Sequence, residues 1–102
     1  MIARVWRGAT RAADEDAYVE YLESSGMRAA RELPGSRGTI VLRRRDGELT
    51  EFVTLLLFDS IDDVNAFAGD DVSVARFFPD DDRWLLERDL DVRHYEVDAH
   101  LD

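Results

Sequence analysis

The 102-residue sequence contains no cysteine and no lysine, and it has only two prolines and six glycines. The missing cysteine excludes disulfides, thiolate catalysis and most structural zinc sites. No segment approaches the roughly 18 consecutive apolar residues that a membrane-spanning helix requires. The first residues, Met1–Arg7, carry charges inside an apolar stretch, which indicates a strand and not a signal peptide. We therefore expect a single cytoplasmic domain, residues 1–102, that has no contact with a membrane.

Positive charge is also scarce, and every positive side chain is an arginine. The 23 acidic residues outnumber the 13 basic ones, and the net charge is −10. Residues 46–102 hold 17 acids and four arginines, while residues 1–45 hold six acids and nine arginines. A field of this sign repels nucleic acid and anionic membranes, so neither is expected as a partner. The acidic, lysine-free composition has two possible origins, adaptation to high salt, which screens self-repulsion, and a genome rich in G and C.

The hydrophobic pattern alternates between period 2 and the helical period. Acidic residues after Asp14 favour a helix start there, and Pro34-Gly35 ends this helix, with an interruption near Ser25. Ser60 begins a second helix with a capping-box pattern, and Gly69 ends it. Expected strands are 2–9, 38–45, 48–58 and 90–99, with a tight turn at Asp46-Gly47, a helical turn within 72–78 and a short helix at 83–87 capped by Asp80.

The predicted order of elements is β-α-β-β-α-β. Short connections and right-handed crossovers then favour a four-stranded antiparallel sheet with both helices on one face. The expected fold class is therefore α+β, of the ferredoxin-like (split βαβ) type.

The third expected strand is apolar on both faces. A sheet with helices on one side should alternate apolar and polar residues, yet 52–58 read Phe-Val-Thr-Leu-Leu-Leu-Phe. In a single copy Val53, Leu55 and Leu57 would face water, and monomers seldom expose an apolar patch of several hundred Å². Covering a patch on the order of 400 Å² stabilises an assembly by roughly 10 kcal/mol before association costs. The pattern predicts a two-fold homodimer; the alternative is a monomer with an unusually large core.

Few residues are suited to chemistry. His94, on the last strand, can accept or deliver a proton near neutrality, although a hydrogen-bonded structural role is more common. The first and last strands are neighbours in this fold, so Arg4 and Trp6 can converge beneath the helices with either His94 or Tyr95. An indole beside a phenol and a cation suits a flat aromatic ligand. The alternative is that Trp6 and Tyr95 are ordinary core aromatics.

Other motifs point to neither a metal nor a cofactor. Asp80–Asp82 lacks the alternating spacing of a calcium loop and is interpreted as a helix cap with solvated charge. Arg43–Arg45 is expected to pair with acids across the hairpin. The sequence contains no glycine-rich phosphate loop, no Gly-x-Ser-x-Gly turn and no His/Glu pair at metal-ligand spacing.

A set of short motifs runs along nearly the whole chain: Ile2–Gly8, Tyr18-x-x-Tyr21-Leu22, Pro34–Gly38, Leu42–Arg44, Glu51-Phe52, Ile61, Ala66–Gly69, Phe78–Asp81, Leu85–Arg88 and His94–Glu96. Together they resemble the antibiotic biosynthesis monooxygenase (ABM) family, within the dimeric α/β barrel superfamily. The resemblance implies a ferredoxin-like subunit whose sheet packs against that of a second copy, with a pocket between sheet and helices. The family includes cofactor-free oxygenases of polyaromatic phenols and quinols, heme-degrading enzymes and proteins that are not oxygenases.

The sequence departs from two patterns of that family. Many relatives carry Trp-His-Gly where this chain has Trp6-Arg7-Gly8, and heme-degrading members use a histidine in the second-helix region, whereas 61–78 contains none. Heme binding is therefore not expected.

Two functional hypotheses follow. The first is a cofactor-independent monooxygenase for a small aromatic or polyketide-like phenol. In the cofactor-free relatives, protein groups help to form a substrate carbanion that passes an electron to oxygen. His94 would be the proton acceptor and Arg4 the partner of a developing phenolate, with pocket walls from Trp6, Phe67, Phe77 and Trp84. The second hypothesis is a non-catalytic, small-ligand-binding or stress-related dimer of the same fold.

Overall fold

The computed structural model describes residues 1–100. Its elements in chain order are β1 (Ile2–Arg11), the 3-10 helix η1 (Ala12–Asp14), α1 (Glu15–Ser24), α2 (Gly26–Arg31), β2 (Ser36–Asp46), β3 (Leu49–Phe58), α3 (Ile61–Ala68), α4 (Asp81–Trp84), β4 (Glu87–Arg88) and β5 (Arg93–Glu96). The strands pair antiparallel in the order β2-β3-β1, with β4 and β5 both beside β1. Strands β4 and β5 together occupy the place of the fourth strand, at the edge of the sheet beside β1. The structure therefore confirms the predicted ferredoxin-like α+β arrangement. None of the helices in the described part of the chain is long and apolar enough to cross a membrane.

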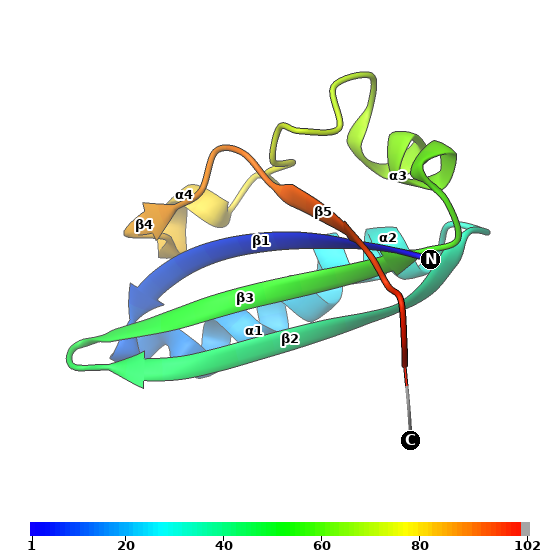
Figure 1. Cartoon of the computed structure of the whole chain (residues 1–102). Helices are drawn as coiled ribbons and strands as arrows, with labels where there is room; N and C mark the ends of the chain where they lie inside the picture. Colours follow the sequence, from blue (N-terminus) through cyan, green and yellow to red (C-terminus); the bar gives the residue numbers. More distant parts are fainter. Residues whose placement is uncertain (101–102) are drawn as a thin grey trace.

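The molecule has two layers, a sheet and a helical layer on one of its faces (Figure 1). Strand β3 places Phe52, Leu56 and Phe58 against the helices, where they are buried. Both predicted helical regions contribute to this core, because α1 and α2 supply one part and α3 another. The buried partners are Tyr18, Leu22, Met27, Ala30, Val64, Phe67 and Leu85.

Three local predictions agree with the structure. Ser25 leaves the helical region, with φ −114° and ψ −98°, and separates α1 from α2. The Ser60 hydroxyl accepts a backbone hydrogen bond from the first turn of α3 and so caps that helix. The hairpin forms as expected, but its loop is Gly47-Glu48, one residue later, and Gly47 takes the positive φ of +64°.

The expectation for the arginine triplet was only partly right. Arg44 pairs with Glu51 across the hairpin, at 3.4 Å. The side chains of Arg43 and Arg45 instead reach the start of α1, where they pair with Asp16 at 2.8 Å and Glu15 at 2.6 Å. Alternation along β2 explains the difference, because neighbouring residues of a strand point to opposite faces.

The last strand was predicted as one continuous element over residues 90–99, and this was wrong. Within that range only β5 (Arg93–Glu96) is a strand, and a second short strand, β4 (Glu87–Arg88), lies before it, at the end of the predicted short helix. The residues between β4 and β5 leave β1 and pair with the chain that follows α3. Ala75 N–H donates to Leu90 O and Val92 N–H donates to Ser73 O, both at 2.8 Å. Competing backbone partners therefore divided the strand.

The same pairing explains one of two further corrections. Residues 72–78 contain no helix: a turn at 72–73 is closed by the Val74 N–H bonding Asp71 O at 3.4 Å, and residues 73–75 pair with residues 90–92. The short helix α4 begins earlier than expected, at Asp81, and the Asp80 side chain does not cap it. Instead, the Asp81 carboxylate accepts the backbone N–H of Phe78 at 2.7 Å. We call residues 69–80, between α3 and α4, the connecting segment.

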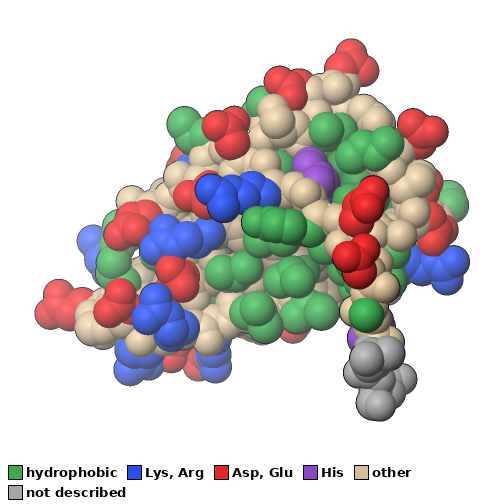
Figure 2. Space-filling model, viewed as in Figure 1, with side chains coloured by type: hydrophobic (Ala, Val, Ile, Leu, Met, Phe, Trp, Pro, Cys, Tyr) green, Lys and Arg blue, Asp and Glu red, His purple; other side chains and the backbone are tan. Residues whose placement is uncertain are grey.

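The face of the sheet opposite the helices carries no other element of residues 1–100 (Figure 1). Its register brings together one set of side chains, which we call the open face: Val5, Ile40, Leu42, Val53, Leu55, Leu57 and Tyr95. Ile40 and Leu42 are 43% and 50% exposed. Figure 2 shows apolar side chains gathered over the middle of this face, with charged ones around them. The predicted two-sided apolar strand is thus present, and the homodimer inferred from it stays a prediction.

Candidate functional site

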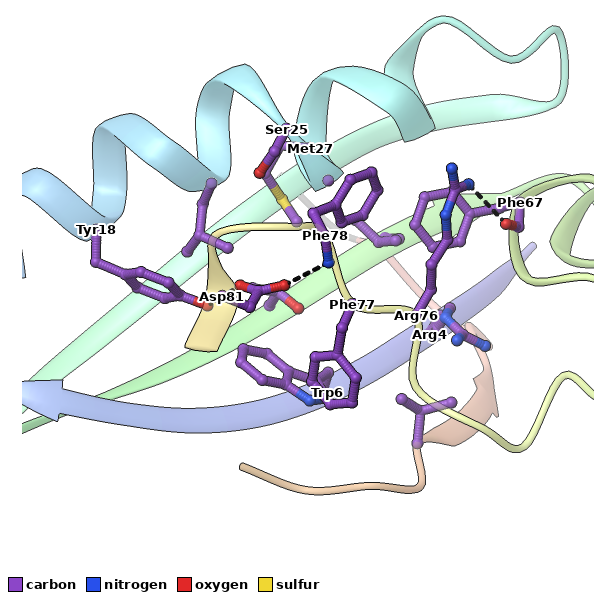
Figure 3. A pocket seen from close by; sticks show the side chains of 15 residues that line it. Arg4, Trp6, Tyr18, Ser25, Met27, Phe67, Arg76, Phe77, Phe78 and Asp81 are labelled. Atoms are coloured by element: carbon purple, nitrogen blue, oxygen red, sulfur yellow. Dashed lines mark hydrogen bonds between the residues drawn. The ribbon is translucent and has the colours of Figure 1, made fainter. Parts of the chain in front are cut away.

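A small cavity lies between the sheet, the helices and the connecting segment, and its volume is about 50 Å³. Figure 3 shows Tyr18 and Asp81 at one end and Arg4 and Arg76 at the other, with the rings of Trp6, Phe77 and Phe78 between them. The residues that line it are Arg4, Trp6, Tyr18, Leu22, Ser25, Gly26, Met27, Thr54, Leu56, Phe67, Arg76, Phe77, Phe78, Asp81 and Val92. Four of the residues predicted from the sequence therefore meet at one site, namely Arg4, Trp6, Phe67 and Phe77.

Arg4 is a buried cation, with 3% of its surface exposed. Its Nη1 donates to Val72 O at 2.6 Å and its Nη2 to Val74 O at 2.8 Å, so the guanidinium fastens the connecting segment to β1. The guanidinium carbon lies 5.7 Å from the centre of the Phe67 ring. Burial lowers the pKa of Arg4 to about 10. The side chain therefore carries its charge at neutral pH in a poorly solvated position.

His94 is adjacent to this cation but does not line the cavity. Its Nε2 lies 3.1 Å from Arg4 Nη1. Because an arginine can only donate, Nε2 must be the acceptor, and the proton of the neutral ring is on Nδ1. Burial, and then the charge of Arg4, lower the pKa of His94 below its ordinary value. His94 is therefore neutral at pH 7 and positions Arg4.

Trp6 forms the wall of the cavity on the side of the sheet. Its Nε1–H donates to Asp89 O at 2.9 Å, and the Phe77 ring meets the indole edge-on with centroids 6.3 Å apart. Gly8 makes this position possible: a Cβ at residue 8 would lie 2.4 Å from Trp6 Cη2. The pattern Trp6-x-Gly8 thus allows the indole to lie across its own strand.

The opposite end of the cavity contains a buried tyrosine–carboxylate pair that the sequence analysis did not identify. Tyr18 donates its hydroxyl to Asp81 Oδ1 at 3.1 Å, while Oδ2 accepts the N–H of Phe78. Burial, reinforced by the Asp81 carboxylate, raises the pKa of Tyr18. The position of Tyr18 on the apolar face of its helix could have indicated that it is buried. Asp81 gave no such signal, because the sequence analysis had interpreted it as a solvated charge.

Two predicted residues lie away from the cavity. Tyr95 is on the open face and 51% exposed, because alternation along β5 turns it away from His94. Trp84 packs beside the core, and its buried Nε1–H has no hydrogen-bond partner in the described residues. Sequence reasoning also missed Arg76 and Thr54, since neither belongs to a recognisable pattern.

The residues around the cavity do not form a metal or heme site. No group of three or more His, Asp or Glu side chains within residues 1–100 could hold a metal ion. A heme does not fit the residues present, because 61–78 offers no histidine and a cavity of about 50 Å³ is far smaller than a porphyrin.

Solved structures of other proteins share this fold along nearly the entire chain. A Bacillus cereus protein that is provisionally named an antibiotic biosynthesis monooxygenase matches with a TM-score of 0.69 and 15% identity, over 99% of this chain and 96% of that chain. A Nitrosomonas europaea protein with the same provisional name matches with a TM-score of 0.66 and 16% identity, over 97% and 100%. The heme degrader MhuD of Mycobacterium tuberculosis, with two hemes bound in its active site, matches with a TM-score of 0.60 and 17% identity, over 100% of both chains.

No protein-family model and no curated protein matches the sequence. At this level of identity the structural matches establish the fold, and chemistry must be argued from the site. The resemblance carried by the short sequence motifs is confirmed at that level: structures bearing the name antibiotic biosynthesis monooxygenase have the fold of this chain.

Proposed function

We propose that this protein is an ABM-type monooxygenase that oxidises a small aromatic or polyketide-like phenol without a cofactor. One observation carries the proposal: a buried guanidinium and three aromatic rings, those of Trp6, Phe67 and Phe77, line a single cavity. Aromatic walls favour a flat ring, and a poorly solvated cation favours the ionised oxygen of a phenol over its neutral form.

In this proposal Arg4 stabilises the negative charge that develops on the phenol oxygen when the substrate loses a proton. The resulting anion, whose charge is shared between the oxygen and a ring carbon, then passes an electron to O₂. One oxygen atom ends in the product, and the other leaves as water. His94 can accept the substrate proton only after Arg4 turns toward the ligand, because the Nε2 lone pair now accepts from Arg4.

We further propose that the working form is a homodimer joined through the open face. A second copy is the occupant that fits, because the face is apolar at its centre and carries charges of both signs at its rim. There, Arg7 pairs with Glu51 at 2.6 Å and lies 3.3 Å from Glu87. Two-fold symmetry would place equal apolar patches against each other.

Oxygen uptake tests the catalytic proposal. A panel of phenols and quinols with one to three rings would be screened with an oxygen electrode. With an active compound, Arg4→Gln and His94→Ala should each lower kcat/KM by about 10²-fold or more, since each removes charge stabilisation or a proton acceptor. Arg83→Gln, a change at an exposed arginine outside the cavity, is the matched control. Unchanged turnover in His94→Ala would remove its proposed role.

A second function, ligand binding without turnover, is favoured by two specific observations. The cavity of about 50 Å³ is nearly filled by protein side chains, and the one histidine beside it is engaged by Arg4. The two functions separate in one experiment, because a pure binder raises the melting temperature with a ligand that causes no oxygen uptake.

A further inference from the structure

The Arg4 guanidinium has hydrogen-bond donors left over. Of its five N–H groups, two on Nη1 are used by Val72 O and His94 Nε2, and one on Nη2 is used by Val74 O. The Nε–H and the second Nη2–H have no partner among residues 1–100. No carboxylate in this part of the chain lies within 4.0 Å of the guanidinium. A buried cation with spare donors and no counter-ion is a place for an anion.

The other charged residues of the cavity also favour an anion at the Arg4 end. Arg76 adds a second cation at the same end, where it donates to Phe67 O at 2.8 Å and stacks on the Phe67 ring at 4.9 Å. The cavity has one carboxylate among its described lining residues, Asp81, which lies at the far end (Figure 3). Both Asp81 oxygens are already bonded, by Tyr18 and by the backbone of Phe78.

A hydroxyl on the cavity wall offers a ligand a further contact. Thr54 lines the cavity and is 4% exposed, and its hydroxyl is not among the buried polar atoms of residues 1–100 that lack a partner, so it remains accessible from the cavity. A ligand oxygen at the Arg4 end could accept from this hydroxyl as well as from the guanidinium.

Phe77 occupies the aromatic part of the site. Its ring lies between the Trp6 indole, at 6.3 Å, and the Arg88 guanidinium, at 4.7 Å. A free volume of about 50 Å³ does not admit a further ring, since a cavity that takes up benzene measures about 150 Å³. Phe77 belongs to the connecting segment and is only partly buried. It can therefore move without opening the core.

We propose that the cavity is a subsite for an aromatic monoanion, whose anionic oxygen binds Arg4 and Thr54 and whose ring replaces the Phe77 side chain beside Trp6. This inference rests on the proposed function and narrows its substrate class to rings that carry an ionised oxygen group, as in a benzoate or a phenolate. Neutral aromatic molecules of the same shape are rejected, because they leave the buried charge without a partner.

The test uses benzoate and its neutral counterpart benzamide, with binding followed by calorimetry and by the Trp6 indole N–H resonance. Benzoate should bind the wild-type protein at least about tenfold more tightly than benzamide. Phe77→Ala should tighten benzoate binding about tenfold by freeing the ring position. Arg4→Gln should remove the preference for benzoate, whereas Arg83→Gln should keep it.

Equal affinity for benzoate and benzamide would overturn the anion subsite, and unchanged binding in Phe77→Ala would overturn the ring position. If Arg4→Gln does not fold, Thr54→Val keeps the shape of the cavity and should weaken benzoate binding severalfold. Benzoate lacks the phenol hydroxyl that the proposed oxidation requires, so its binding can be measured apart from turnover. Binding without any oxygen uptake from the phenol panel supports the subsite and removes the oxygenase; uptake without selective benzoate binding does the reverse.

Discussion

The two faces of the sheet differ in where their polar side chains lie. The covered face, which is packed against the helices, buries Arg4, Thr54 and the Tyr18–Asp81 pair beside its aromatic core. The open face, which has no covering element among residues 1–100, is apolar at its centre. A face that only had to be filled would be expected to be apolar when covered and polar when exposed. The reversal supports both proposals, a binding site on the covered face and a second copy over the open face.

The largest effect is expected from a charge placed on the open face. Leu55→Glu puts a carboxylate in the middle of the apolar patch. The Kd of the proposed dimer should rise by more than about 100-fold, because an unpaired charge would be buried in the interface. Sedimentation at micromolar concentration measures this. Ile61→Glu, a change at an exposed apolar residue of α3, should leave the assembly intact. If the wild-type protein sediments as particles of 11.7 kDa, the mass of one chain, the open face is not covered by a second copy.

The next largest effect should come from the covered face. Phe52 is fully buried and packs on Tyr18 with ring centroids 5.1 Å apart. Phe52→Ala should lower the free energy of unfolding by about 3–5 kcal/mol by leaving a cavity. Its neighbour on the open face, Val53, gives the matched variant Val53→Ala, which should weaken association more than folding. Urea unfolding at several protein concentrations separates the two effects; the same concentration dependence in both variants would show that the faces are not distinct.

A third prediction concerns the position of Trp6 on the covered face. Gly8→Ala would force the indole away from its strand and break the Trp6–Asp89 hydrogen bond, at a cost of about 1–3 kcal/mol. The indole N–H resonance of Trp6 should shift strongly. Gly26→Ala is the milder control, because its Cβ would lie 3.3 Å from the flexible Phe78 ring. An unshifted resonance in Gly8→Ala would mean that the indole does not lie over Gly8.

The smallest expected effect depends on pH. The pKa of His94 is lowered in the folded protein, so the unfolded chain takes up the proton first as the pH falls below the ordinary value of 6.5. Stability should therefore decrease from pH 7.5 to 5.5, and His94→Gln, which can still accept from Arg4, should decrease less over this range. Denaturant unfolding at both pH values measures the difference. Equal losses in the two proteins would show that His94 titrates as it does in the unfolded chain.

Local signals were sufficient for most of the N-terminal two-thirds of the fold. Alternation identified the first three strands, Ser60 marked the start of α3, and Gly47 marked the hairpin. These features depend on neighbouring residues, so a sequence carries them directly. The apolar character of β3 on both faces was equally visible, and it gave the dimer prediction.

The C-terminal third could not be predicted in the same way. Residues 90–92 and 73–75 each have the composition of an ordinary strand or turn, and only their meeting in space decides that they pair with each other. Their pairing divided the last strand and left the connecting segment extended over the cavity. Hydrogen-bond partners that are distant in sequence are chosen by competition within the folded chain.

The candidate site shows the same division. The sequence by itself placed Arg4 and Trp6 on one side of the sheet, together with either His94 or Tyr95, and made both sides of β3 apolar. Only the tertiary structure decided that Arg4 is buried without a carboxylate, that His94 is its acceptor and that Phe77 fills the space beside Trp6. Periodicity fixes the direction of a side chain, whereas burial, charge balance and free volume depend on what every other segment leaves around it.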